Sequence, residues 1–185
     1  MSMVFSRRSF LKYTAVAAVA VAGSSLLSGC DGVFSNPNRP TGVAGQTLTL
    51  EGSHKLENPI YTASTKTLTC DMTLKCTSAN GLSVMSSNFS VKVTDKDGKV
   101  KADYNTLGTT NNGVSISSGT QNLSKGQSMT TKLTVTGFAF EETDTVAVCY
   151  WPRKYATATG DPLQDVYATW VLQNPAKKIA DIKTV

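Results

Sequence analysis

The sequence predicts an all-β protein whose folded part is an antiparallel sandwich of about seven or eight short strands in two sheets. Three observations lead to this fold class. From Gln46 onward, apolar and polar residues alternate with a period of two, the period of a strand with one buried face. Turn sequences that contain glycine separate the alternating runs. After the N-terminal segment, no amphipathic helical stretch exceeds two turns.

The clearest predicted strand covers residues 67–76. Alternate positions in this run place five apolar side chains on one face: Leu68, Cys70, Met72, Leu74 and Cys76. Polar residues take the other face. Because one face is buried and the other is wet, the pairing register of this strand is fixed by its sequence.

Further strands are expected at residues 47–51, 89–94, 99–104, 114–117, 130–135, 146–151 and 167–172. The turn D-K-D-G-K joins the strands at 89–94 and 99–104, and Gly98 supplies its positive φ. A second turn, L-S-K-G-Q, covers residues 123–127. The run V-A-V-C-Y-W at 146–151 is apolar on both faces, which is typical of a central strand.

The net positive charge comes largely from the N-terminal segment. The chain has 18 basic and 13 acidic residues, a formal charge of +5. The first 29 residues contain Arg7, Arg8 and Lys12 but no acid, so their removal leaves 18 − 3 = 15 bases against 13 acids. This residual charge of +2 is scattered, and the sequence therefore offers no electrostatic case for nucleic-acid binding.

The same segment has the features of an export signal. Its uncharged stretch at residues 13–27 is only fifteen residues long, whereas a transmembrane helix needs about 20 strongly apolar residues. The preceding motif S-R-R-S-F-L-K resembles the twin-arginine signal at Arg7, Arg8, Phe10 and Leu11. The resemblance implies export of a folded chain by the twin-arginine translocase. The alternative is an ordinary secretory signal that carries two arginines.

The segment Leu27, Ser28, Gly29 and Cys30 resembles a bacterial lipobox. The resemblance implies cleavage before Cys30 and attachment of a diacylglyceryl group to its thiol. Each buried CH₂ contributes about 0.8 kcal/mol, and two acyl chains anchor a protein stably where one does so only marginally. We therefore expect a protein held by lipid on the extracytoplasmic face of the cell membrane. The alternative is a cleavage site without lipid.

The predicted domain organisation has three parts: a signal peptide at residues 1–29, a lipidated cysteine with a Pro- and Gly-rich linker at 30–45, and the sandwich at 46–185. Residues 46–152 resemble the telokin-like, immunoglobulin-like domain of bacterial surface lipoproteins in the turns at 95–99 and 123–127 and in the C-Y-W-P run at 149–152. The resemblance implies an immunoglobulin-like fold. The chain departs from antibody domains at Ala147, where the tyrosine corner would need a tyrosine.

Cysteine spacing limits the disulfides that can form. Cys70 and Cys76 would lie about 20 Å apart on one strand, too far to bond each other. A disulfide between Cys76 and Cys149, or between Cys70 and Cys149, is therefore expected in an exported domain. The alternative is three buried, reduced thiols that pack as small hydrophobic side chains.

No other motif points to catalysis, a metal or a cofactor. A single histidine excludes sites that need two imidazoles, and His54, in E-G-S-H-K, is predicted to lie in a surface loop. Asp95, Asp97 and Asp103 fit a turn better than a calcium site, since the EF-hand pattern is not met. Core packing explains the C-terminal aromatic residues more simply than a ligand-stacking platform does. These residues are Tyr150, Trp151, Tyr155, Tyr167 and Trp170.

The expected function is that of a non-catalytic binding or structural module, tethered to the membrane, with a protein or cell-wall partner that the sequence does not identify. A second hypothesis is an accessory or assembly subunit of an exported redox enzyme. A third is an enzyme or cofactor carrier whose site has no recognisable motif.

Overall fold

The protein is a β-sandwich, as the sequence predicts. The computed structural model describes residues 39–105, 113–152 and 166–185. The strands in chain order are β1 (Thr41–Val43), β2 (Thr47–Thr49), β3 (Gly52–Thr62), β4 (Thr67–Cys76), β5 (Leu82–Val84), β6 (Phe89–Thr94), β7 (Val100–Asn105), β8 (Ser115–Ile116), β9 (Gln121–Leu123), β10 (Ser128–Thr136), β11 (Thr145–Tyr150), β12 (Ala168–Asn174), β13 (Ile179–Ala180) and β14 (Lys183–Thr184). The described residues also form the short 3₁₀ helices η1 (Ser86–Asn88) and η3 (Pro175–Lys177).

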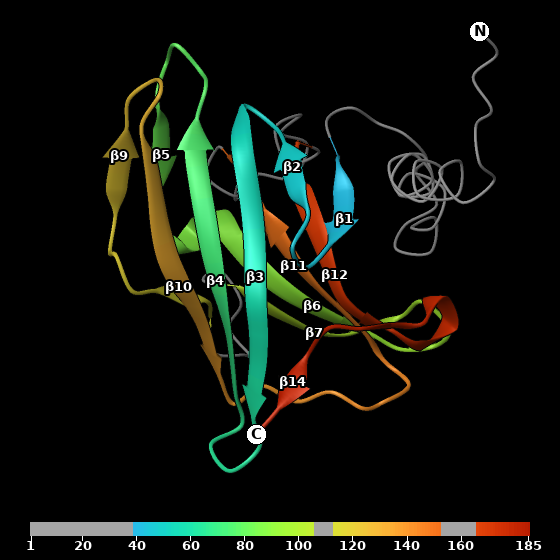
Figure 1. Ribbon diagram of the computed structural model, residues 1–185. Helices are drawn as coiled ribbons and strands as arrows, with labels where there is room; N and C mark the ends of the chain where they lie inside the picture. Colours follow the sequence, from blue (N-terminus) through green and yellow to red (C-terminus); the bar gives the residue numbers. More distant parts are fainter. Residues whose placement is uncertain (1–38, 106–112, 153–165) are drawn as a thin grey trace, which may run out of the picture.

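Two main sheets pack face to face. Sheet A has the order β1-β12-β11-β6-β7, with β13 also paired to β12. Sheet B has the order β14-β3-β4-β10-β8, with β2 also paired to β3. Strands β5 and β9 form a small third sheet. Figure 1 shows β3, β4 and β10 crossing in front of β6, β7, β11 and β12.

The alternation predicted for residues 67–76 is confirmed in β4. Its five apolar side chains are buried in the space between the sheets, while its other side chains are half-buried or exposed. Strand β11 lies between β12 and β6, as its uniformly apolar sequence predicts. Burial of a leucine side chain contributes about 1.5–3 kcal/mol, so this layer of side chains supplies much of the stability.

The strand β3 is not among the predicted elements, although it is the longest in the described chain. Its register on β4 shifts between Glu57 and Ile60, and Asn58 in this bulge has a φ of 50°. Pro59 falls at the same place, where the ladder needs no amide hydrogen. The bulge reverses the faces of the flanking residues, so the sequence of β3 shows no continuous alternation.

The sandwich begins earlier than the predicted boundary at residue 46. Strand β1 falls within the linker expected at residues 30–45, yet it pairs in parallel with β12 of sheet A. The backbone amide of Thr169 donates to the carbonyl of Pro40 at 2.9 Å, and the Trp170 indole Nε1 donates to the carbonyl of Gln46 at 3.0 Å. The N-terminal segment is therefore tied to sheet A from residue 40 onward.

Both terminal segments cover the same side of the sandwich. Strands β1 and β13 add to β12 in sheet A, and β2 and β14 add to β3 in sheet B. Unpaired strand edges favour aggregation, so these short strands protect the two long strands at that side. Within the described ranges, no helix has the length and apolar character needed to cross a membrane.

Candidate functional site

The residues predicted for export and lipidation lie outside the described part of the chain. They are Arg7, Arg8, Phe10, Leu11, Leu27, Ser28, Gly29 and Cys30. Tyr155 of the aromatic set also falls outside it.

Among the described residues, the structure contains no bond between Cys76 and Cys149 or between Cys70 and Cys149, the two alternative disulfides that the sequence predicts. Cys70 and Cys76 belong to the core between the sheets. Val148 and Tyr150 also face this core, so alternation along β11 turns Cys149 to the opposite face of sheet A. There its sulfur lies 3.7 Å from Oγ1 of Thr169. Burial raises the pKa of the Cys70 thiol to about 12, which makes it a poor nucleophile.

His54 is fully buried, and the prediction of a surface loop is wrong. The residue lies near the start of β3, opposite Leu74 of β4, and its side chain turns into the core. The local sequence E-G-S-H-K resembles a loop because it is polar. However, Gly52 is needed there for close packing, since a Cβ on it would meet the His54 ring and the carbonyl of Lys75.

Of the two ring nitrogens of His54, one has a hydrogen-bond partner among the described residues. Its Nε2 lies 2.9 Å from the carbonyl of Leu50 and must carry the proton, because a carbonyl only accepts. Among the described residues, neither the other nitrogen, Nδ1, nor the hydroxyl of Tyr150 has a hydrogen-bond partner, and the Tyr150 ring packs edge-on at 4.9 Å from His54. Burial lowers the pKa of His54, with the Leu50 hydrogen bond opposing that effect. The imidazole is therefore a neutral core residue that no bulky external substrate reaches.

The described members of the aromatic set act mainly in packing. Tyr150, Trp151 and Trp170 are buried. Half-buried Tyr167 packs on Trp151 with ring centroids 5.1 Å apart, and the Arg39 guanidinium lies 5.2 Å from the centre of the Tyr167 ring. These contacts fit the predicted core role rather than an exposed stacking platform.

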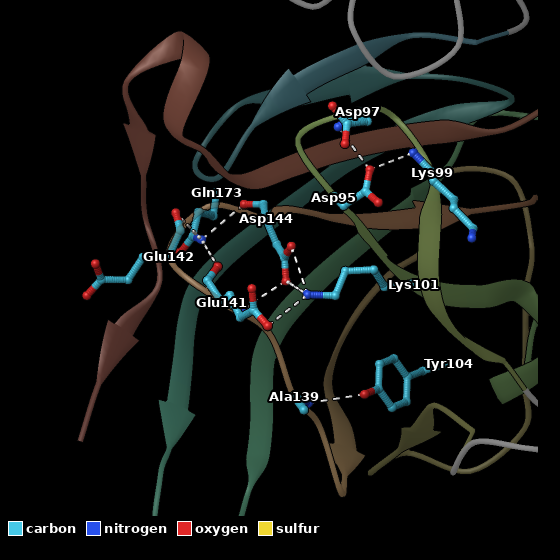
Figure 2. Close-up of polar contacts among 10 residues, drawn as sticks. All are labelled: Asp95, Asp97, Lys99, Lys101, Tyr104, Ala139, Glu141, Glu142, Asp144 and Gln173. Atoms are coloured by element: carbon cyan, nitrogen blue, oxygen red, sulfur yellow. Dashed lines mark hydrogen bonds and ion pairs between the residues drawn. The ribbon is translucent and has the colours of Figure 1, made fainter.

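A polar cluster joins β7 to the loop at residues 137–144, as Figure 2 shows. The Lys101 ammonium lies 2.9 Å and 3.1 Å from the two carboxylate oxygens of Asp144 and 3.2 Å from the Glu141 carboxylate. Asp144 has only 1% of its surface exposed, and it also accepts a 2.8 Å hydrogen bond from the amide of Glu141. The hydrogen bond to Asp144 is the largest cause that raises the pKa of Lys101.

The same loop is also held by a residue of β12 and by a second residue of β7. The side-chain amide of Gln173, at the end of β12, donates to the carbonyls of Glu141, Glu142 and Asp144 at 3.0, 3.4 and 3.1 Å. The Tyr104 hydroxyl accepts a 3.1 Å hydrogen bond from the amide of Ala139. Residues 137–144 therefore form a rigid loop on the sandwich. Sequence reasoning missed this cluster because its members lie up to 72 positions apart in the chain, from Lys101 to Gln173.

The prediction of a turn at residues 95–99 is confirmed. Asp95 Oδ1 accepts from the amides of Asp97 and Lys99, both at 2.9 Å, and Gly98 has a φ of 83°. The Asp95 carboxylate thus closes its own turn (Figure 2). Within the described ranges, no group of three or more His, Cys, Asp or Glu side chains could hold a metal ion.

A small surface pocket of about 260 Å³ lies beyond the ends of β4 and β11. Its lining consists of Glu51, Ser78, Asn80, Gly81, Leu82, Ser83, Met85 and Pro152. Glu51 has a left-handed backbone with a φ of 54°, which is uncommon outside glycine. The pocket is open to solvent and mixes polar with apolar groups.

Comparison with solved structures finds remote similarities. The yjhA protein of Bacillus subtilis has a TM-score of 0.41 and 12% identity, with 71% of this chain and 98% of that chain covered. The ycdA protein of Bacillus subtilis subsp. subtilis strain 168, described as a candidate lipoprotein, has a TM-score of 0.45 and 14% identity. That match covers 74% of this chain but 41% of the ycdA chain. The archaellum periplasmic stator protein FlaG of Sulfolobus acidocaldarius has a TM-score of 0.38 and 10% identity, with 65% and 98% covered.

No curated protein sequence matches the chain. One family model does: that of the TAT (twin-arginine translocation) pathway signal sequence matches residues 4–24. This range includes Arg7 and Arg8, so the export motif predicted from the sequence is confirmed. The chain therefore carries a twin-arginine signal sequence, followed by a β-sandwich, and is exported across the cytoplasmic membrane.

Proposed function

We propose that the protein is a non-catalytic module anchored by lipid on the extracytoplasmic face of the cell membrane. The observation that carries this proposal is the position of Cys30. It follows Leu27, Ser28 and Gly29 and lies six residues beyond the end of the matched signal sequence at residue 24. A cysteine in that context is the expected acceptor of a diacylglyceryl group, which supplies two acyl chains.

The location of the reactive side chains supports a binding or structural role. The one histidine and the cysteines at 70, 76 and 149 are all buried. A general base or a thiol nucleophile must reach its substrate, whereas these groups are buried against other residues of the sandwich. In the polar cluster, Lys101, Asp144 and Gln173 hold a loop in place, which is a way to preorganise a recognition surface.

The strand order supports assignment of the sandwich to the immunoglobulin type. In that fold, strands A, B, E and D form one sheet, and G, F and C form the other. Here β3, β4, β10 and β8 have the order of strands A, B, E and D. Strands β12, β11 and β6 have the order of G, F and C, and β7 is added at the edge next to β6. Among the described residues no disulfide joins the two sheets, and Ala147 stands where the tyrosine corner of antibody domains has a tyrosine.

The anchor is tested by membrane fractionation of the wild-type chain and a Cys30→Ala variant. We expect the wild type in the membrane fraction and the variant released after export. An Arg7→Lys/Arg8→Lys variant is the matched control, because it should block export and leave both the signal peptide and the anchor unprocessed. Equal membrane retention of the wild type and Cys30→Ala would refute the lipid anchor.

Mass spectrometry of the mature protein tests the same proposal chemically. The expected N-terminus is Cys30 with a diacylglyceryl modification. Affinity purification of the intact protein from detergent-solubilised membranes then identifies its partner. Recovery of a redox enzyme in stoichiometric amount would favour the accessory-subunit hypothesis, and turnover by the purified protein itself would overturn the non-catalytic assignment.

A further inference from the structure

The turn between β4 and β5 contains an asparagine followed by a glycine, Asn80 and Gly81. Figure 1 shows this connection as the green loop at the top of the sandwich. The amide of Gly81 donates to the carbonyl of Ser78 at 3.3 Å, and the amide of Asn80 donates to the Ser78 hydroxyl at 3.2 Å. These lengths lie at or beyond the upper limit of about 3.2 Å for an ordinary N–H···O bond, so weak hydrogen bonds close the turn.

The fold requires a glycine at position 81. Its φ is 74°, in the left-handed region that residues with a Cβ rarely adopt. A Cβ at this position would also approach the carbonyl oxygen of Leu123, in β9, to 2.9 Å. The residue that follows Asn80 therefore carries no side chain that would hinder access to its amide nitrogen.

The side chain of Asn80 is exposed, and no described residue forms a hydrogen bond with its amide group. A bond from its carbonyl carbon, Cγ, to the amide nitrogen of Gly81 would close a five-membered ring. Groups held this close in one molecule react far faster than separate molecules do. Solvent reaches the side chain, so it can supply a base for the amide proton and carry away a leaving group.

The other described asparagines lack one or more of these features. They are Asn58, Asn88, Asn105, Asn122 and Asn174. Asn58 and Asn174 precede prolines, which have no amide hydrogen to lose. Asn88 is buried, and its side chain is held at both ends by the Met85 amide at 2.7 Å and the Trp151 carbonyl at 2.8 Å. Asn105 and Asn122 lie in strands and precede a threonine and a leucine, whose side chains crowd the following amide.

We propose that Asn80 is a site of spontaneous deamidation in the folded protein. The Gly81 amide gives its proton to a solvent base, and its nitrogen attacks Cγ of Asn80. The Cγ–Nδ2 bond then breaks, and Nδ2 takes a proton from solvent and leaves as ammonia. Water opens the resulting succinimide ring at either carbonyl. Breakage of the bond from the Gly81 nitrogen to Cγ gives aspartate, and breakage of its bond to the main-chain carbonyl carbon gives isoaspartate. The net change is the gain of one water and the loss of one ammonia, without oxidation or reduction.

Either product places a new carboxylate in the wall of the surface pocket. Asn80 and Gly81 both line this pocket, and Glu51 already contributes a carboxyl group to it. In isoaspartate the main chain also runs through Cβ and Cγ, which lengthens the turn by one carbon atom. Because ammonia is lost, water does not restore the asparagine. The modified fraction therefore rises with the age of the protein.

Peptide mapping of the purified mature protein by mass spectrometry tests this site. The protein is kept under native conditions at pH 7 and at pH 8, and timed samples are digested with trypsin at mildly acidic pH, which suppresses further reaction. The peptide from Cys76 to Lys92 contains both Asn80 and Asn88, so the buried asparagine is an internal control. A second Asn-Gly pair, at 112–113, begins outside the described residues and falls in a different peptide.

Asn80→Gln is the matched variant, because its longer side chain keeps the amide group but would have to close a six-membered ring. Protein unfolded in guanidinium chloride and treated in the same way measures the reactivity of the Asn-Gly pair without the fold. Neither control depends on the lipid anchor.

We expect Asn80 to convert in the native protein to aspartate and isoaspartate, which have equal mass and are separated by chromatography. Asn88, Asn122 and the variant Asn80→Gln should stay unchanged. The rate should rise by up to about tenfold from pH 7 to pH 8, because the attacking group is a deprotonated amide. Absence of conversion in the native protein, whether or not the unfolded chain reacts, would overturn the proposal, and so would conversion of Asn88 at the rate of Asn80.

Discussion

Lowering the pH from 7 to 5 should destabilise the sandwich through protonation of its single histidine. His54 is fully buried, its Nε2–H donates to the carbonyl of Leu50, and no described residue offers its Nδ1 a hydrogen-bond partner. A second proton on Nδ1 would therefore place a charge in the core with no acceptor to stabilise it. Burial lowers the pKa of His54 below the 6.5 of an exposed histidine for this reason.

The direction of the effect follows from proton binding. In the unfolded chain His54 takes up a proton near pH 6.5, whereas in the folded state it does so only at lower pH. The full stability is thus present above pH 6.5 and is lost as the pH falls through that value toward the lower pKa of the folded state. One proton contributes about 1.4 kcal/mol per pH unit, so the loss between pH 7 and pH 5 is at most about 2 kcal/mol.

Urea denaturation between pH 5 and pH 8 measures this loss, with the mature chain carrying Cys30→Ala as the soluble background. A His54→Leu variant is the control, because its side chain of similar size cannot titrate. At pH 8 the two proteins should differ by about 1 kcal/mol or less, since the variant loses one hydrogen bond but also removes an unsatisfied nitrogen. Carboxylates such as Asp71, whose pKa is lowered mainly by a hydrogen bond from Asn58, titrate alike in both. Parallel pH profiles for the two proteins would refute the reasoning.

Three further predictions concern the loops and the thiols. Asp144→Ala should lower the free energy of unfolding by about 1–3 kcal/mol, because the backbone amide of Glu141 loses its buried acceptor. Asp144→Asn should lower it less, since its side-chain oxygen can still accept that hydrogen bond. Equal losses for the two variants in urea denaturation would contradict this role of Asp144. Gly126→Ala should cost about 1 kcal/mol by the same assay because Gly126 has a φ of 88°, and an unchanged midpoint would contradict it. Cys70, Cys76 and Cys149 should resist alkylation in the native protein and react without reductant in guanidinium chloride; thiols that stay unreactive after unfolding would indicate a disulfide.

Local patterns in the sequence were sufficient for part of the fold. Strand β4 is predictable because each alternate residue of 67–76 has the same polarity and the strand contains no bulge. The turn at Asp95 is predictable for a similar reason, since its capping carboxylate and its glycine lie within five residues. The export signal is also a linear motif, which a translocase recognises in the sequence itself.

Other features depend on contacts between distant parts of the chain. The polar sequence around His54 predicts a loop, but the His54 ring packs against Tyr150, 96 positions later in the sequence. Cys149 lies in a strand that is apolar on both faces, so alternation alone leaves open which face meets the core. The structure turns Val148 inward and Cys149 outward, away from the core face that carries Cys70 and Cys76.

By itself the sequence determined the export route, the position of the candidate lipid anchor and the β character of the folded part, because each of these depends on residues that are neighbours in the chain. Only the tertiary structure decided that the N-terminal strand joins β12, that the histidine lies in the core, and that Lys101, Asp144 and Gln173 together hold one loop. The physical reason is that burial and hydrogen bonding are properties of contacts in space. The strand order of the two sheets brings these residues together from separate regions of the chain.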